Sequence, residues 1–211
     1  MNTLVDFFDR YIHGSGQALV YDDGFRRWTY SRQQLRAAAC AFAVRLEAAG
    51  IGYGDRVLIW GESRPEWVAA FWGCVLRGAA VIPIDASATR DLIDRVIDVA
   101  KPSGIVAGDP AGAVPCRSVR CAWSWRDVAW SGTAAPSRDA AITADTVAEI
   151  VFTSGTTGEP KGVTITHRNI LANITPIERE AIAYRRYLWP FRPIRFLGLL
   201  PLSHMFGQAL T

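Results

Sequence analysis

A glycine- and hydroxyl-rich stretch at residues 153–162 holds the side chains best suited to chemistry in this 211-residue sequence. It reads Thr-Ser-Gly-Thr-Thr-Gly-Glu-Pro-Lys-Gly. Glycines let the backbone approach an anion closely, successive backbone N–H groups can form an anion-binding nest, and hydroxyls add further donors. Lys161 adds a point positive charge. These residue types in this order indicate a site for triphosphate or pyrophosphate.

Two other interpretations of this stretch are weaker. A flexible surface hairpin can also be rich in Gly, Ser and Thr, but about nine specified positions would coincide by chance less than once in roughly 10⁸ placements. The Walker phosphate loop requires Gly-Lys-Ser/Thr after a four-residue gap. Here Pro160 precedes Lys161 and Gly162 follows it. An ordinary P-loop NTPase is therefore disfavoured.

The elements around this loop follow a strand–helix alternation. A buried strand is predicted at 147–152, directly before the loop, and a short strand at 163–166 precedes a helix that begins near His167. Further strands are predicted at 56–60, 80–84, 104–107 and 194–200, and helices at 35–49, 65–77 and 89–101. Alternation with short connections indicates an α/β fold with parallel sheets flanked by helices.

Local signals mark where some of these elements start and stop. Ser31 and Gln34 have the spacing of a capping box at the start of the alanine-rich helix, and Gly50 closes that helix. Between residues 108 and 145 the pattern weakens into a short strand, a short helix and a polar linker at 131–144. We therefore predict an N-terminal α/β subdomain over 1–145 and the start of a second subdomain over 146–211.

Three segments together resemble one protein family. They are the run Ile-Val-Phe-Thr-Ser-Gly-Thr-Thr-Gly-Glu-Pro-Lys-Gly-Val at 150–163, Leu-Arg-Gly-Ala-Ala-Val-Ile-Pro-Ile-Asp at 76–85, and Leu-Pro-Leu-Ser-His-Met-Phe-Gly at 200–207. They resemble the signature of the AMP-binding, adenylate-forming superfamily of acyl-CoA synthetases, peptide-synthetase adenylation domains and luciferases. The resemblance spans essentially the whole chain, and it implies the N-terminal portion of the large domain of such an enzyme.

The resemblance implies a reaction and a set of site residues. In such enzymes a carboxylate attacks the α-phosphorus of ATP to give an acyl-adenylate and pyrophosphate, and a thiol such as coenzyme A then displaces AMP. Seven residues would hold the β- and γ-phosphates: Thr153, Ser154, Gly155, Thr156, Thr157, Gly158 and Lys161. Thr153 would also help to place Mg²⁺. His204, Phe206 and Gly207 would border the acyl pocket.

The substrate is expected to be a long-chain fatty acid, because the segment at 200–207 has the form common in fatty-acid enzymes and an aromatic, basic stretch at 184–196 precedes it. An acyl-acyl-carrier-protein ligase or an amino-acid adenylation domain is the alternative within the superfamily. A non-catalytic nucleotide-binding module is the alternative of another class. The family's later motifs lie outside these 211 residues, so the chain alone is not expected to adenylate.

Composition narrows the partners. A net charge of +3 from 23 basic and 20 acidic residues is too small and dispersed for a nucleic-acid footprint. The basic cluster at Arg179, Arg185, Arg186, Arg192 and Arg195 is interpreted as a solvated face, with peripheral membrane association as the alternative. The four cysteines lack metal-binding spacing and are interpreted as reduced structural thiols. Without a signal-peptide pattern or a long apolar run, the expected location is the cytoplasm. The oligomeric state stays open.

Overall fold

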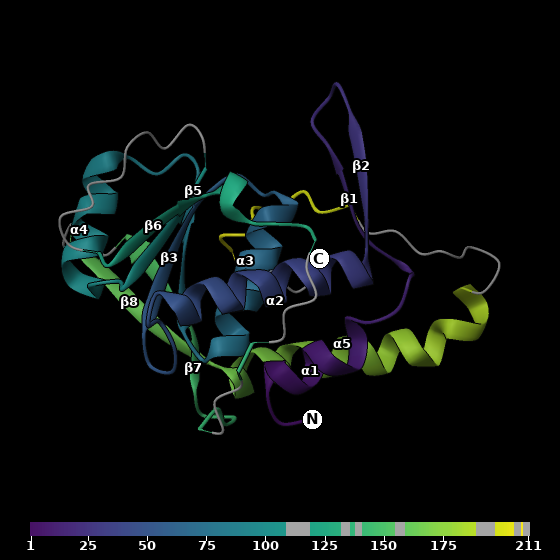
Figure 1. The fold of residues 1–211 in the computed structure, drawn as a ribbon. Coiled ribbons are helices and arrows are strands. Elements are labelled where there is room, and N and C mark those ends of the chain that lie inside the picture. The colour runs from purple at the N-terminus through teal and green to yellow at the C-terminus, as the bar shows by residue number, and fades with distance from the viewer. Residues whose placement is uncertain are drawn as a thin grey trace.

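The computed structural model describes residues 1–108, 119–131, 136–137, 141–154, 159–188, 197–204 and 208. Figure 1 shows a mixed sheet with helices on both faces. The helices are α1 (Leu4–Tyr11), α2 (Arg32–Ala48), α3 (Pro65–Arg77), α4 (Arg90–Ala100), α5 (His167–Leu188) and the short 3₁₀ helix η2 (Trp125–Asp127). The strands are β1 (Gln17–Asp22), β2 (Arg27–Ser31), β3 (Arg56–Gly61), β4 (Ala80–Asp85), β5 (Gly104–Ala107), β6 (Cys121–Ser124), β7 (Val147–Ser154) and β8 (Pro160–Thr166).

Six of these strands form the main sheet in the order β6-β5-β3-β4-β7-β8. All neighbours pair in parallel except β7 and β8, which are antiparallel. The strand–helix alternation therefore predicted the α/β fold and its parallel sheet correctly. Strands β3, β4 and β5 are buried on both faces, which explains why they lack an apolar–polar alternation.

Each face of the sheet has its own core. On one face, apolar side chains of α1, α2, α3 and α5 pack against Val57, Val81 and Val106. On the other face, α4 packs against Leu58, Ile82 and Ile105. Alternate residues of the same strands supply the two cores, because successive side chains of a strand point to opposite faces.

The predicted capping box is present at the start of α2. Gln34 N–H donates to Ser31 Oγ at 3.1 Å, and Ser31 N–H donates to Gln34 Oε1 at 2.8 Å. The helix therefore begins at Arg32, three residues before the predicted run at 35–49. Gly50 follows the helix with φ 68°, a left-handed conformation that glycine adopts without steric cost.

Several elements differ from the prediction. Helix α1 and the β1–β2 hairpin were not predicted, and β8 begins at Pro160 instead of residue 163. The strand predicted at 194–200 is wrong for residues 197–200, the part of that segment that the structure describes. Leu197 and Leu199 are both 81% exposed, so these apolar side chains do not join either core. A strand needs a neighbouring strand for its backbone hydrogen bonds, and none in the described part pairs with these residues.

The region around the predicted boundary at residue 145 is partly as expected. Strand β6 and helix η2 are the short strand and short helix predicted between 108 and 145. Strands β7 and β8, which lie past the boundary, complete the same sheet as β3 to β5. The division into 1–145 and 146–211 stays a prediction.

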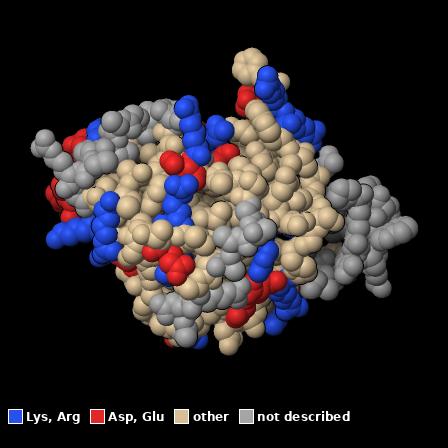
Figure 2. Space-filling model, in the orientation of Figure 1, with Lys and Arg blue, Asp and Glu red and all other residues tan. Residues whose placement is uncertain are grey.

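Two surface properties follow from the described residues. None of the helices in this part of the chain combines the length and the apolar character needed to cross a membrane. On the face shown in Figure 2, Lys and Arg side chains lie interspersed with Asp and Glu side chains.

Candidate functional site

Strands β7 and β8 place the two ends of the predicted phosphate loop side by side. Thr153 and Lys161 are direct partners in the antiparallel pair, and both side chains are exposed. Partners in an antiparallel pair project from the same face of the sheet. A hydroxyl and an ammonium group therefore flank the tip of the hairpin. Residues Gly155, Thr156, Thr157 and Gly158, and the side chain of Ser154, lie outside the described part of the structure.

Gly162 allows this hairpin to pack tightly. It pairs with Phe152, and a Cβ at this position would come within 2.9 Å of Ile150 Cγ2 and 3.1 Å of Phe152 Cζ. Ile150 and Phe152 pack against the core under α4. The glycine after Lys161 is thus required by packing below the loop, in addition to any role near an anion.

A magnesium ion at this position would have Thr153 as one ligand. Mg²⁺ prefers oxygen ligands, retains water molecules and commonly binds through substrate phosphates. An exposed hydroxyl at the end of β7 fits that role. Across the described residues, no group of three or more His, Cys, Asp or Glu side chains is placed to hold a metal ion.

Thr153 and Lys161 lie at the end of the sheet that holds the carboxyl ends of the parallel strands, which we name the carboxyl edge. In open α/β sheets, ligands bind at the carboxyl ends of the strands. Val81 of β4 pairs with Glu149 of β7. Asp85 and Thr153 each lie four residues further along these strands, so Asp85 ends β4 at the same edge.

Asp85 is held in its ionised form by neighbouring hydroxyl and amide groups. Ser87 donates to its carboxylate through both Oγ, at 2.6 Å, and N–H, at 2.9 Å. These bonds, together with a weaker one from Ser203 and the nearby His204, hold the pKa of Asp85 below its ordinary value. The edge therefore carries a negative charge beside the predicted cationic loop.

Residues 201–204 and 208, which we name the His204 turn, are fixed to this same edge. Leu202 N–H donates to Ser63 Oγ at 2.9 Å, and Ser203 Oγ donates to Asp85 Oδ2 at 3.1 Å. Leu202 and Ser203 are buried, whereas His204 is exposed. The turn therefore brings the predicted acyl-pocket residue His204 to the edge that carries the phosphate loop. The other two predicted pocket residues, Phe206 and Gly207, lie outside the described residues.

Glu149 is a buried group that the sequence interpretation missed. Its residue is 0% exposed, and neither carboxylate oxygen has a hydrogen-bond partner in the described part of the structure. Burial raises the pKa of Glu149 to about 7, and the amide of Gln208 opposes part of this rise without reaching hydrogen-bonding geometry. The available signal was a lone carboxylate within the apolar run 147–152.

His167 has the structural role expected for it. It begins α5, and its Nδ1 accepts a hydrogen bond from Leu4 N–H at 3.0 Å. Burial lowers the pKa of His167 to about 4, and the nearby Asp6 opposes this shift. The imidazole is therefore neutral at pH 7 and joins α1 to the start of α5.

The aromatic, basic stretch is described only in part. Tyr184 and Tyr187 lie on α5, are more than half exposed, and have ring centroids 6.3 Å apart. Arg192, Arg195 and the side chains of Arg185 and Arg186 fall outside the described residues. Both interpretations of this stretch, a solvated face and a membrane contact, stay predictions.

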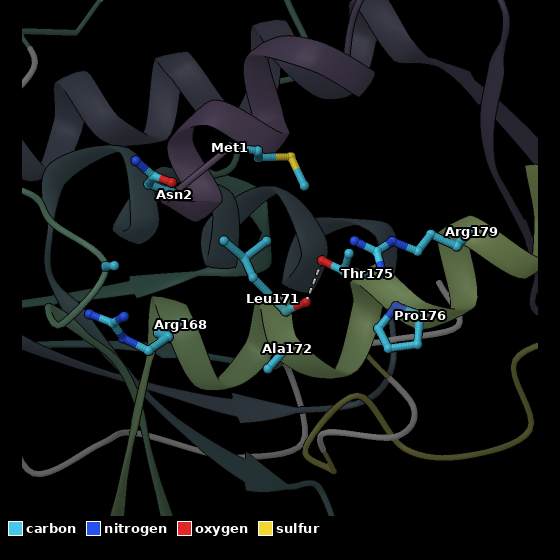
Figure 3. Close-up of a pocket in the computed structure, with 9 residues that line it drawn as sticks. Met1, Asn2, Arg168, Leu171, Ala172, Thr175, Pro176 and Arg179 are labelled. Carbon is cyan, nitrogen blue, oxygen red and sulfur yellow. Dashed lines mark hydrogen bonds between the residues drawn. The ribbon is translucent and has the colours of Figure 1, made fainter.

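A surface cavity of about 390 Å³ lies away from the candidate site. Figure 3 shows Met1 and Asn2 on one side of it and Leu171, Thr175 and Pro176 of α5 on the other. It lies near the start of α5, whereas the phosphate loop is at the opposite end of β8. Arg168 at its rim already forms a bidentate ion pair with Asp145, at 2.8 and 2.9 Å. This cavity contains none of the predicted site residues.

Comparison with known proteins adds a family match. The sequence model described as AMP-binding enzyme matches residues 9–211. The D-alanine--D-alanyl carrier protein ligase of Streptococcus equi subsp. equi is 29% identical over 174 residues, which are 82% of this chain and 33% of that protein. Phenyloxazoline synthase MbtB of Mycolicibacterium paratuberculosis is 37% identical over 153 residues, which are 71% of this chain and 13% of that protein.

A solved structure agrees with these matches. The fatty acyl-adenylate ligase from L. pneumophila, in complex with acyl adenylate and pyrophosphate, superposes with a TM-score of 0.70 at 26% identity. The match covers 82% of this chain and 32% of that chain. The chain thus spans about a third of the length of this structure and of the carrier protein ligase.

Proposed function

Because the chain belongs to the AMP-binding enzyme family, we propose that it supplies the phosphate-binding hairpin of an enzyme that activates a fatty acid with ATP. The observation that carries this proposal is the pairing of Thr153 with Lys161 across the hairpin, at the carboxyl edge of the sheet. A carboxylate oxygen of the fatty acid attacks the α-phosphorus of ATP. The bond between the α-phosphorus and the oxygen that bridges it to the β-phosphorus breaks. The products are acyl-adenylate and pyrophosphate.

The role of this chain in that step is to position and stabilise the leaving pyrophosphate. Lys161 and the N–H and hydroxyl groups of residues 153–158 bind the β- and γ-phosphates. Negative charge builds up on these phosphates as the bond breaks, so fixed donors there stabilise the transition state more than the ground state. Thr153 would be one ligand of a bound Mg²⁺, which would supply additional charge neutralisation.

Two observations support a fatty acid as the substrate that binds at this edge. The fold matches a fatty acyl-adenylate ligase at 26% identity. The tethers from Ser63 and Asp85 hold His204 at the edge where the reacting carboxylate has to lie. We propose coenzyme A as the thiol, which attacks the acyl carbon, displaces AMP and leaves a thioester.

A second candidate has its own support. The carrier protein ligase matches 82% of this chain, and its name specifies D-alanine as the activated acid. In this alternative the same hairpin binds ATP, but the acid is an amino acid and the acceptor is a carrier protein. The candidates differ in the carboxylate that binds beside His204.

Histidine resonances can separate the two candidates, because His13, His167 and His204 are the only histidines in the sequence. The chain is titrated with dodecanoate or with D-alanine in the presence of ATP, and the imidazole signals are followed by NMR. His204→Asn assigns the His204 signal. We expect dodecanoate to shift the His204 signal and to leave that of His13, an exposed residue outside the site, unchanged. A shift with D-alanine alone would favour the carrier-protein candidate.

The same samples test whether the chain completes the reaction. Because it spans about a third of the carrier protein ligase, we expect no ATP–pyrophosphate exchange dependent on fatty acid. Exchange by the purified chain would show that these 211 residues suffice for adenylation.

A further inference from the structure

The most unusual group in the described structure is the carboxylate of Glu149. It lies in β7 between Val81 of β4 and Ile165 of β8, both of which are buried apolar residues. The described residues leave both of its oxygens without a hydrogen-bond partner. Native proteins pair nearly all buried polar groups, so an unpaired carboxylate requires an explanation.

Residues of the His204 turn lie near this carboxylate, since Leu202 belongs to the same core cluster as Val81 and Ile165. Gln208 lies close enough to influence the ionisation of Glu149, and its Nε2 donates to Leu202 O at 2.8 Å. Gln208 N–H in turn donates to His204 O at 3.2 Å. The turn that presents His204 therefore lies near Glu149, and these two hydrogen bonds connect Gln208 to the rest of the turn.

Ionisation of Glu149 at this buried position is costly. A buried charge without a partner costs several kcal/mol, whereas a neutral carboxylic acid costs much less. The flanking strands cannot easily move to admit water, because β7 is paired on both sides within the sheet. The His204 turn is attached by only a few hydrogen bonds, so it is the part that yields.

We propose that Glu149, as a neutral acid, is a positioning residue for His204: the turn stays seated while the carboxyl is protonated and loosens when it ionises. Protonation of Glu149 thus controls the position of His204, a residue of the predicted acyl pocket. The proposal concerns the seating of the turn and holds whichever carboxylate the enzyme activates.

The electrostatic surroundings agree with this geometry. Burial is the main cause of the raised pKa of Glu149, and among the described residues Gln208 is the only other contributor. None of the titratable or charged side chains on the neighbouring elements contributes to that pKa: Asp85 on β4, Lys161 on β8, Glu66 and Arg77 on α3, His167 on α5, and His204 in the turn. Burial thus has the largest influence on the protonation of Glu149, and Gln208 of the turn contributes to it.

Hydrogen exchange of the amides of Leu202, His204 and Gln208, measured by NMR, tests the proposal. With an ordinary pKa of 4.5 in the released state and about 7 in the seated state, seating weakens as the pH rises through this window and then levels off. Between pH 5.5 and pH 8, after correction for chemical exchange, we expect protection to fall on the order of 25-fold. Amides of β5 serve as the internal reference.

Two variants decide the outcome. Glu149→Gln keeps the shape without the charge, and Glu149→Leu keeps the volume if the glutamine variant does not fold. Both are expected to show protection that does not depend on pH. His204→Asn removes the imidazole from the same turn and is expected to retain the dependence. Protection in the native chain that is independent of pH, a dependence that persists in either Glu149 variant, or its loss in His204→Asn would overturn the proposal.

Discussion

Two buried titratable groups near the start of β7, His167 and Glu149, differ in whether they have a hydrogen-bond partner. Near the start of the strand, where β8 leads into α5, the imidazole of His167 accepts a hydrogen bond from Leu4. At the third residue of the same strand, the carboxylate of Glu149 has no partner among the described residues. Burial shifts both pKa values toward the neutral form, down to about 4 for His167 and up to about 7 for Glu149. The hydrogen bond of His167 joins α1 to the start of α5. The unpaired carboxylate of Glu149, as we propose, makes the position of the His204 turn depend on pH.

Opposite responses to pH are expected at the two groups, and the response at His167 should appear in the stability of the whole protein. A base whose pKa is lowered by folding stabilises the protein fully above its unfolded value of 6.5, and this stability is lost as the pH falls toward 4. At pH 5 the loss is about 2 kcal/mol, as an upper estimate, relative to pH 7.5. Urea unfolding at the two pH values measures it.

His167→Gln is the matched variant for this measurement. Its side-chain oxygen can still accept from Leu4 N–H, and it does not titrate. The difference in unfolding free energy between pH 5 and pH 7.5 should therefore shrink by about the same 2 kcal/mol. An unchanged pH dependence in this variant would show that protonation of His167 does not cause the loss of stability at pH 5.

A smaller effect is expected at the His204 turn, and it should be local. Ser203→Ala removes the hydrogen bond to Asp85 and is expected to weaken the seating of the turn by about 1 kcal/mol, which is roughly a fivefold loss of amide protection. The pKa of Asp85 should rise toward its ordinary value, by less than in Ser87→Ala, because Ser87 contributes most to lowering it. Hydrogen exchange and carboxyl NMR titration measure the two effects.

Ser203→Ala also tests whether the His204 turn opens independently of the sheet. Loss of the Ser203 tether is expected to leave the free energy of global unfolding nearly unchanged, since the turn can open without the sheet. If Ser203→Ala instead destabilised the whole protein as much as protonation of His167 does, the turn would be part of the core and not a segment that opens separately.

Sequence patterns predicted the parts of the fold that depend on local rules. The apolar strands β3, β4 and β5 and the helices between them follow from hydrophobic pattern and length. The capping box at Ser31 and Gln34 was readable because its spacing is itself the structural requirement. The hairpin was predicted as a loop between strands, but Pro160, Lys161 and Gly162 resemble loop residues, so the early start of β8 was missed.

The features that were missed depend on contacts between distant residues. The short strands β1 and β2 carry a weak pattern and form because they pair with each other. Leu197 and Leu199 look like buried residues, but burial depends on partners that a local pattern does not specify. The burial of Glu149 likewise depends on residues that are distant in the sequence, among them Val81 of β4. The positions of Thr153, Lys161 and His204 at one edge were implied by the motifs, whereas their ligands remain proposals.

The proposed function requires that the β7–β8 hairpin binds the phosphates of ATP, and calorimetric titration of the chain with ATP and Mg²⁺ measures this binding. Lys161→Ala removes the loop cation and is expected to weaken binding at least about tenfold, because hydrogen bonds to charged groups contribute about 1.5–3 kcal/mol. Lys101→Asn is the control, because it removes the only other lysine in the sequence. The backbone of Lys101 is left-handed, with φ 46°, a conformation that asparagine tolerates. We expect native affinity for Lys101→Asn and a large loss for Lys161→Ala, whereas unchanged affinity in Lys161→Ala would rule out Lys161 as a phosphate-binding residue.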